Sequence, residues 1–215
     1  MGFFKKKPSI YSKSAKVLSE IGFCDDYIKA LNEDIDAATK PRDINKGKSY
    51  LCNALIICGR LTKAYEVFHE IDLNTLDKIL SPNLVQNIIF SLFVRNKFSE
   101  ADELYYKHNR LVLHEHTDSM RRTLAIHEHI QGRYENSITI LAKLLESDCR
   151  FLDICLIKSM LKLDMYESAA EIGGSLNAYD GLYELGDETL KLKRKILSAL
   201  NGKKIKKTNH KKRKK

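Results

Sequence analysis

The sequence predicts an all-α protein, an α-α superhelix of about five helical hairpins followed by one closing helix. A short pattern recurs at intervals of 37, 37, 36 and 32 residues, which indicates repeated structural units. Each copy opens on Gly, Asn or Asp, and no segment carries the sustained alternation of β-branched and polar residues that is typical of a strand. The copies begin at Gly22, Gly59, Asn96, Gly132 and Asp164.

Each copy predicts a turn that leads into the second helix of a hairpin. Gly, Asn and Asp adopt the left-handed backbone conformation that ends a helix more easily than other residues do. Five residues after the opening residue stands Tyr, Ala or Ser, and in four of the five copies a Leu or an aromatic residue follows four positions later. This spacing places both on one helix face, where a small side chain such as Ala64 or Ala101 permits close approach of the paired helix.

An apolar first helix is expected before each opening residue. Ser81 and Pro82 are typical of an N-cap followed by a proline in the first turn of the third such helix, and Thr117 or Asp118 is suited to cap the fourth. The first helices are predicted at 9–21, 43–58, 82–95, 118–131 and 149–163. The closing helix is predicted at 187–200, with a Lys- and Glu-rich face suited to solvent.

The segments GRLTKAYEVF from Gly59 and GRYENSITIL from Gly132 resemble the second half of a tetratricopeptide repeat (TPR). The resemblance covers about residues 9 to 178, in degenerate form, because the chain contains no Trp and its spacing exceeds the usual 34 residues or so. The chain is also similar to small bacterial proteins of unknown activity that carry a Phe/Lys-rich leader and such repeats. The resemblance implies a TPR-like α-solenoid whose first helices line a concave, partner-binding face.

Charge divides the chain into a leader at 1–8, a helical-repeat domain at 9–200 and a basic tail at 201–215. The tail holds nine of the 37 basic residues, and the other 28 balance the 28 acidic ones, so the net charge of +9 belongs to the tail. With almost no apolar side chains, the tail is predicted to be disordered and suited to non-specific binding of nucleic acid or an anionic surface. The alternative is a tail that only keeps the protein soluble. Its basic residues are Lys203, Lys204, Lys206, Lys207, Lys211, Lys212, Arg213, Lys214 and Lys215.

Polar residues gather on the face that the first helices are expected to present. Aligning the small residues of the second helices places on it Lys46, Ser49, Asn53, Asn83, Gln86, Asn87 and Arg122, together with Ile56, Ile57 and Ser119. Asn and Gln suit an extended peptide, because each amide both donates to and accepts from a backbone. Asn53 and Asn87 also fall where the carboxylate clamp of some relatives has asparagines, although Ser49, Ser119 and Thr123 stand where that clamp has bases. The alternative interpretation is an ordinary solvated helix surface.

Five cysteines, an odd number, and the lack of a secretory h-region at the start of the chain predict reduced thiols and a cytoplasmic protein. Cys52 and Cys58, like Cys149 and Cys155, are six residues apart, which is neither the spacing of a zinc knuckle nor one helical turn. No apolar run approaches the roughly 18 residues needed to cross a bilayer. We therefore expect no transmembrane segment.

Histidines cluster in the middle of the chain. They are His108, His114, His116, His127 and His129. Residues two apart in a helix point in widely different directions, so His127 and His129 are poorly placed to share one ion, although one of them could join the pair at 114 and 116. No nucleophile elbow, phosphate-binding loop or H-E-x-x-H motif is present. We expect no enzyme activity, no cofactor and no metal.

Two hypotheses for function remain. The first is a protein–protein interaction scaffold that binds a peptide or a helix in the concave groove of the array. The second is a nucleic-acid- or ribosome-associated protein that is tethered by the Lys/Arg tail.

Overall fold

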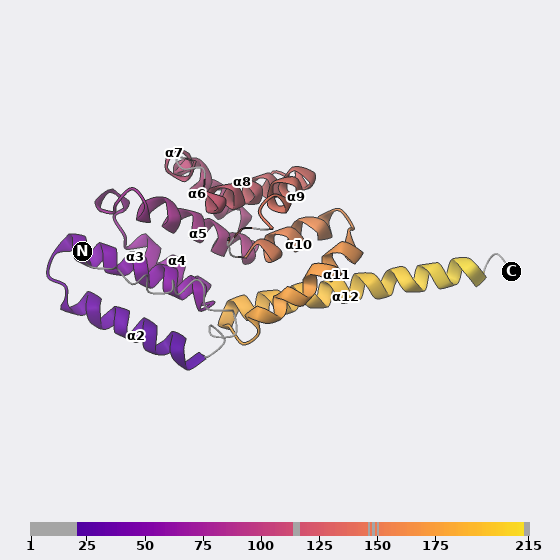
Figure 1. Cartoon of the computed structure of the whole chain (residues 1–215), viewed down its shortest axis with the longest axis horizontal. Coiled ribbons are helices and arrows are strands. Elements are labelled where there is room, and N and C mark those ends of the chain that lie inside the picture. The colour runs from indigo at the N-terminus through magenta and orange to yellow at the C-terminus, as the bar shows by residue number, and fades with distance from the viewer. Residues whose placement is uncertain (1–20, 114–116, 146, 148, 150, 213–215) are drawn as a thin grey trace, which may run out of the picture.

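The computed structural model describes residues 21–113, 117–145, 147, 149 and 151–212, and every regular element in these ranges is a helix (Figure 1). Consecutive helices pack in neighbouring pairs, as the sequence predicts. The pairs are α3 (Pro41–Ile57) with α4 (Leu61–His69), α5 (Leu80–Val94) with α6 (Phe98–Lys107), α8 (Asp118–Ile130) with α9 (Tyr134–Ala142), and α10 (Leu152–Lys162) with α11 (Tyr166–Gly173). The first helices contact one another in the order α3, α5, α8 and α10. Short helical turns occur at η2 (Leu73–Thr75), α7 (Asn109–Val112) and η3 (Gly174–Tyr179).

One kind of turn joins the two helices of every pair. The residue between them has a positive φ, which is 81° at Gly59, 59° at Asn96, 78° at Gly132 and 55° at Asp164. In each turn the next N–H donates to the carbonyl five residues earlier, and the four bonds are 2.8 to 3.0 Å long. This is the Schellman arrangement, which satisfies carbonyls that the end of a helix would leave without partners. The predicted turns at these four positions are confirmed.

The small residue five positions after each turn lies where two helices meet. Ala64, Ala101, Ser137 and Ala169 are each at most 1% exposed. Cys52 Sγ approaches the carbonyl oxygen of Ala64 to 3.2 Å, a contact that a larger side chain at position 64 would obstruct. The predicted role of these residues in close helix packing is therefore confirmed.

The beginning of the described chain differs from the prediction. Helix α2 (Ile21–Ala37) includes Gly22, so the predicted turn at Gly22 is wrong. The predicted helix at 9–21 lies outside the described residues except for its last one, and the leader at 1–8 lies wholly outside them. Helix α2 packs on α3, and a Cβ atom at Gly47 would come within 2.7 Å of Ile35 Cγ1. Glycine at position 47 therefore permits this close approach.

The caps of the first helices are partly as predicted. Thr117 caps α8, because its side chain accepts a hydrogen bond of 3.1 Å from Met120 N. For α5 the prediction is wrong, since Asp77 and not Ser81 accepts the first N–H groups, from Ile79 at 3.0 Å and Leu80 at 2.7 Å. These two bonds also hold the pKa of the Asp77 carboxyl below its ordinary value. The earlier cap lets α5 begin two residues before Pro82, which remains in the first turn.

The last helix, α12 (Tyr183–Lys212), begins four residues before the predicted closing helix and ends twelve residues after it. The backbone is thus helical into the basic tail, as far as residue 212. Lysine is a good helix former, so a segment too polar to join a core can still extend a helix. Its end projects past the helix pairs toward the C-terminus (Figure 1). The side chains from 203 onward and residues 213–215 lie outside the described part.

The first turn of α12 contacts the α3–α4 pair, in addition to the packing of α12 on α11. Leu185 N donates to Gly59 O at 3.2 Å, and the Glu184 carboxylate accepts from Thr62 N at 3.1 Å and from Thr62 Oγ1 at 2.7 Å. A Cβ atom at position 59 would lie 2.3 Å from Leu182 O. Gly59 is therefore required both by its positive φ and by this contact.

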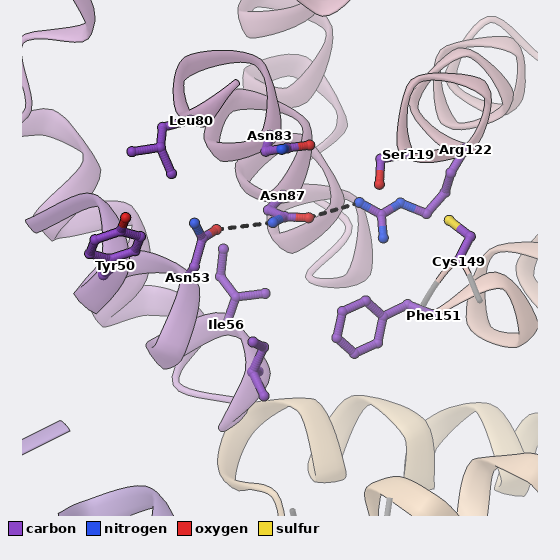
Figure 2. Close-up of a pocket in the computed structure, with 11 residues that line it drawn as sticks. Tyr50, Asn53, Ile56, Leu80, Asn83, Asn87, Ser119, Arg122, Cys149 and Phe151 are labelled. Carbon is purple, nitrogen blue, oxygen red and sulfur yellow. Dashed lines mark hydrogen bonds between the residues drawn. The ribbon is translucent and has the colours of Figure 1, made fainter. Parts of the chain in front are cut away.

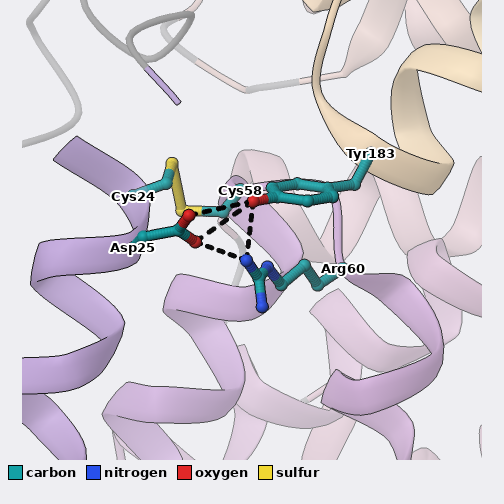
Figure 3. The surroundings of a disulfide bond; sticks show 5 residues. All are labelled: Cys24, Asp25, Cys58, Arg60 and Tyr183. Carbon is teal, nitrogen blue, oxygen red and sulfur yellow. Dashed lines mark hydrogen bonds and ion pairs between the residues drawn. A yellow bond between two sulfur atoms is a disulfide. The ribbon is translucent and has the colours of Figure 1, made fainter. Parts of the chain in front are cut away.

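A disulfide joins α2 to the end of α3 beside this contact (Figure 3). Cys24 and Cys58 form the bond, so the prediction of reduced thiols is wrong for these two residues. Next to them Arg60 pairs with Asp25 and donates to the Tyr183 hydroxyl at 2.6 Å. The first turn of α12 thus meets the disulfide-linked ends of α2 and α3. Two segments more than 120 residues apart in sequence are tied together here.

Candidate functional site

A cavity lies between α3 and α5, and residues of α8 line one side of it (Figure 2). Its volume is about 290 Å³, which is at the small end of the range for ligand sites and is better suited to a side chain than to a cofactor. We call it the amide cavity. It is lined by Tyr50, Asn53, Ile56, Ile57, Leu80, Asn83, Asn87, Ser119, Arg122, Cys149 and Phe151.

A chain of hydrogen bonds crosses the wall of the amide cavity and joins three successive first helices (Figure 2). Asn87 Nδ2 on α5 donates to Asn53 Oδ1 on α3 at 2.9 Å. Arg122 Nη2 on α8 donates to Asn87 Oδ1, also at 2.9 Å. We call this chain the amide ladder. The nitrogen and the oxygen of the Asn87 amide both form bonds within the ladder, so the ladder fixes the orientation of its central residue.

Other amide groups at the cavity have no partner within the described part of the chain. There, Asn53 Nδ2 and both polar atoms of the Asn83 side chain make no hydrogen bond. Both residues are half-buried and line the cavity. They therefore present two amide donors and an amide acceptor to whatever occupies it.

The Phe151 ring in the cavity wall stacks on a buried ring behind it. Phe90 and Phe151 lie parallel, with centroids 4.4 Å apart and planes 13° apart. The Arg122 guanidinium is 5.1 Å from the Phe90 centroid, and Arg122 is only 2% exposed. A cation held over an aromatic face is stabilised by the ring quadrupole. The buried end of the cavity therefore combines an apolar surface with one fixed positive charge.

Phe151 has an uncommon backbone conformation for a bulky residue. Its φ is 62° at the residue that caps the start of α10, in the left-handed region that non-glycine residues adopt at a cost of about 1–3 kcal/mol. Its side chain is held by the stack on Phe90 and lies 5.9 Å from the Tyr179 centroid. The strained backbone thus directs an aromatic ring into the wall of the cavity.

The one thiol in the cavity wall is not set up as a nucleophile. Burial is the largest influence on Cys149 and raises the pKa of its thiol. A thiol with a raised pKa is protonated at neutral pH, and the thiolate is the reactive form. Cys149 therefore contributes packing surface and not nucleophilic chemistry.

The structure brings together four of the seven predicted groove residues, because Asn53, Asn83, Asn87 and Arg122 all line the amide cavity. Ser49 and Gln86 do not line it. Ser49 is buried and donates to Lys46 O at 2.8 Å. Gln86 is 1% exposed and donates to Val112 O of α7 at 3.1 Å. These two side chains satisfy backbone carbonyls instead of meeting a ligand.

Lys46 belongs to a second cavity, of about 280 Å³, at the start of α3. We call it the basic cavity. Its lining residues are Lys40, Arg42, Asp43, Lys46, Thr75, Leu76, Asp77 and Leu80. Leu80 borders both cavities, so the basic and amide cavities adjoin at this residue, and together we call them the groove between α3 and α5.

Four cavity residues were missed by sequence reasoning. Tyr50 was identifiable, because it lies four residues after Lys46 and three before Asn53 on the same face of α3. Leu80 depends on the early start of α5. Cys149 and Phe151 lie outside regular helix, before α10, and no periodicity indicates their position.

The histidines of α8 diverge, as predicted. His127 Nδ1 shares a hydrogen bond of 2.9 Å with Asp102 of α6, whereas His129 Nδ1 shares one of 2.8 Å with Ser159 of α10. Burial lowers the pKa of His129 to about 3, with smaller effects from Lys158 and Lys162. Within the described residues, no three His, Cys, Asp or Glu side chains are placed to hold a metal ion. Residues 114 and 116 lie outside that part of the chain.

Comparisons with known proteins add no assignment, since no family model, curated protein or solved structure matches the chain. In the part of the chain that the structure covers, no helix has both the length and the apolar character needed to cross a membrane.

Proposed function

We propose that this protein is a non-enzymatic interaction scaffold, a TPR-like array that holds an extended peptide in the groove between α3 and α5. The observation that carries this proposal is the amide ladder. It ties Asn53, Asn87 and Arg122 together across three first helices and leaves Asn53 Nδ2 and the Asn83 amide directed to the cavity. A peptide backbone offers the alternating N–H and C=O groups that such amides recognise.

The shape and chemistry of the groove support a peptide over a small-molecule substrate. The amide cavity has room for a side chain, and its Ile56, Ile57 and Phe151 walls favour an apolar one. Its thiol is held in the protonated form, and its one buried cation is engaged in the ladder. The repeated Schellman turns and buried small residues support the TPR-like arrangement of the pairs.

The test is selection of binders from a phage-displayed library of unstructured dodecapeptides. Selected peptides should bind the wild-type protein and lose affinity at least tenfold for the variant Asn53→Ala/Asn83→Ala. A matched control is Asn177→Ala, which removes an exposed amide far along the chain in η3 and should bind as the wild type does. Failure to select any binder, or equal binding by all three proteins, rejects the scaffold proposal.

A second candidate function is association with nucleic acid through the end of α12. It is supported by the continuous helix to Lys212, which includes six of the nine basic residues of the tail. A helix that carries closely spaced cations releases counterions from phosphates on binding. The full-length protein should bind single-stranded RNA with an affinity that falls as the salt concentration rises. Removal of residues 203–215 should abolish this binding. Affinity and salt dependence that survive the truncation exclude this function.

A further inference from the structure

We propose that the peptide in the groove is acidic and lies along α3, with its acidic residues at the basic cavity and an apolar side chain in the amide cavity. This inference rests on the proposed scaffold function and specifies its ligand. It is carried by three features: a stripe of side chains on one face of α3, a wall from the neighbouring α5, and a surplus of exposed positive charge where both helices begin.

The stripe on α3 consists of Arg42, Lys46, Tyr50, Asn53 and Ile57, each of which lines one of the two cavities. Successive members are three or four residues apart, so they lie on one helix face. At 1.5 Å per residue the stripe is about 22 Å long. An extended peptide rises about 3.3 Å per residue, so roughly seven peptide residues would cover it.

The opposite wall comes from α5, which runs in the same direction as α3. The start of α3 and the start of α5 share the basic cavity, through Arg42 and Leu80. Later residues of both helices, Ile57 and Asn87, share the amide cavity. The two helices therefore form a trough with the basic end at both starts and the apolar end further along.

Positive charges outnumber negative ones at the basic end, because Lys40, Arg42 and Lys46 line the cavity with two acids, Asp43 and Asp77. Within the described part of the chain the three cations form no salt bridge, and all three are exposed. Asp77 accepts the N–H groups that begin α5, and Lys46 and Arg42 make smaller contributions to the lowered pKa of its carboxyl. A surplus of one sign in a cleft attracts the opposite sign and sets the orientation of a ligand.

The opposite end of the groove selects a different side chain. Ile57 and Phe151 line the amide cavity, and Arg122 is held there in the ladder. From Lys46 to Ile57 the helix advances about 16 Å, which corresponds to about five residues of extended peptide. The structure thus predicts a ligand with one or more Asp or Glu residues three to five positions from a Leu or an aromatic residue.

The experiment uses peptides selected on the full-length wild-type protein. We expect them to share the acidic–apolar spacing, and we expect Arg42→Gln/Lys46→Gln to weaken their binding about tenfold in fluorescence anisotropy. The same peptides with Gln in place of Asp and Glu should bind the wild type about tenfold more weakly. For these neutral peptides, Arg42→Gln/Lys46→Gln should weaken binding less than twofold, because the positive charges that it removes have no acidic partner in the peptide.

The matched control is Lys63→Gln/Lys143→Gln, which removes the same charge from two exposed positions outside both cavities, on α4 and at the end of α9, and should change affinity less than twofold. Circular dichroism checks that both variants are folded. Selected peptides without acids, or affinity unchanged in Arg42→Gln/Lys46→Gln, overturn the inference.

Two further outcomes separate this inference from the scaffold proposal. If Asn53→Ala/Asn83→Ala abolishes peptide binding while Arg42→Gln/Lys46→Gln leaves it intact, the scaffold stands and the acidic ligand is wrong. If no peptide binds at all, both fall. Binding of poly(U) that requires Arg42 and Lys46 would assign the basic cavity to nucleic acid and also overturn the inference.

Discussion

Two polar clusters join successive helices of this protein, and they differ in whether their hydrogen-bonding groups are used up. The amide ladder lies at the amide cavity, where Asn53 Nδ2 and the side chain of the neighbouring Asn83 have no partner in the described part of the chain. The other cluster, formed by His129, Ser137 and Ser159, is at most 3% exposed. We call it the buried cluster. The contrast separates polar residues that hold the fold from polar residues that are available to a ligand.

The buried cluster is satisfied internally. Ser159 Oγ donates to Cys155 O at 3.1 Å, so its oxygen is left to accept. It shares bonds with His129 Nδ1 at 2.8 Å and with Ser137 Oγ at 3.0 Å. A hydroxyl has one proton and two lone pairs, and all are used here. A fully used network in a low-dielectric interior stabilises one arrangement of its helices.

The largest predicted effect is a loss of stability in acid that depends on His129. Its pKa is about 3 in the folded protein and about 6.5 in the unfolded chain. Since the unfolded chain binds the proton more readily, stability is full above pH 6.5 and falls as pH drops toward 3. Between pH 7 and pH 4.5 the loss should be about 2.5 kcal/mol. Urea unfolding across this range, compared with His129→Gln, measures it. An equal loss in the variant would show that His129 is not the cause.

The next effect should come from Lys158, which lies beside the buried cluster. Its ammonium group donates to Phe93 O at 2.8 Å, Val94 O at 2.9 Å and Asn96 Oδ1 at 2.9 Å. These are carbonyls at the end of α5 and the side chain of the turn residue. Lys158→Met keeps the side-chain length but removes three charge-assisted bonds, and should lower the free energy of unfolding by about 2 kcal/mol.

The matched control for Lys158 lies on the same helix. Lys162→Met changes an exposed side chain and should alter the free energy of unfolding by less than about 0.5 kcal/mol. Lys158→Met should leave peptide affinity unchanged under conditions where the protein is folded, because the residue does not line the groove. A loss of peptide affinity in folded Lys158→Met would contradict this prediction and show that the region of the buried cluster contributes to peptide binding.

How far the sequence predicts these regions depends on the range of the interactions involved. The turns at Gly59 and Gly132 were predictable, because a positive φ is a local demand that favours particular residues. The helix register then placed Asn53 and Asn87 together correctly. Gln86 lies on the same stretch of α5 but bonds to α7, and nothing in its local sequence indicates that neighbour.

The contact between α12 and the α3–α4 pair is a second feature that the local sequence does not predict, over a longer distance along the chain. Glu184 meets Thr62 across 122 residues, and the disulfide between Cys24 and Cys58 spans 34. Helix periodicity describes which face of a helix is apolar, but not which distant surface covers it. The contacts at the end of the α3–α4 pair therefore became visible only in the structure.

A smaller effect tests the strained backbone beside the amide ladder. Phe151→Ala and Phe151→Gly both remove the ring from its stack on Phe90. At a φ of 62° glycine is free of the strain that alanine keeps, so the glycine variant should be more stable than the alanine variant by about 1 kcal/mol. Inside an ordinary helix the order would be reversed. Chemical denaturation of both variants measures the difference, and a less stable glycine variant would contradict the left-handed assignment.

The smallest predicted change in stability belongs to Asn83, and it separates the two clusters most sharply. Its amide makes no hydrogen bond within the described residues, so Asn83→Ala should change the free energy of unfolding by less than about 0.5 kcal/mol. Ser159→Ala removes the hydroxyl shared by the buried cluster and should cost about 1–3 kcal/mol, because it leaves buried groups without partners.

Peptide affinity should follow the opposite order. Asn83→Ala should weaken binding, because an amide that faces the ligand is lost, whereas Ser159→Ala should bind normally when folded. Measuring both quantities on both variants gives a crossed comparison that general damage to the fold cannot imitate. If Asn83→Ala is destabilised as much as Ser159→Ala, the Asn83 amide is structural, and the distinction between ligand-facing amides of the cavity and the buried cluster fails at this residue.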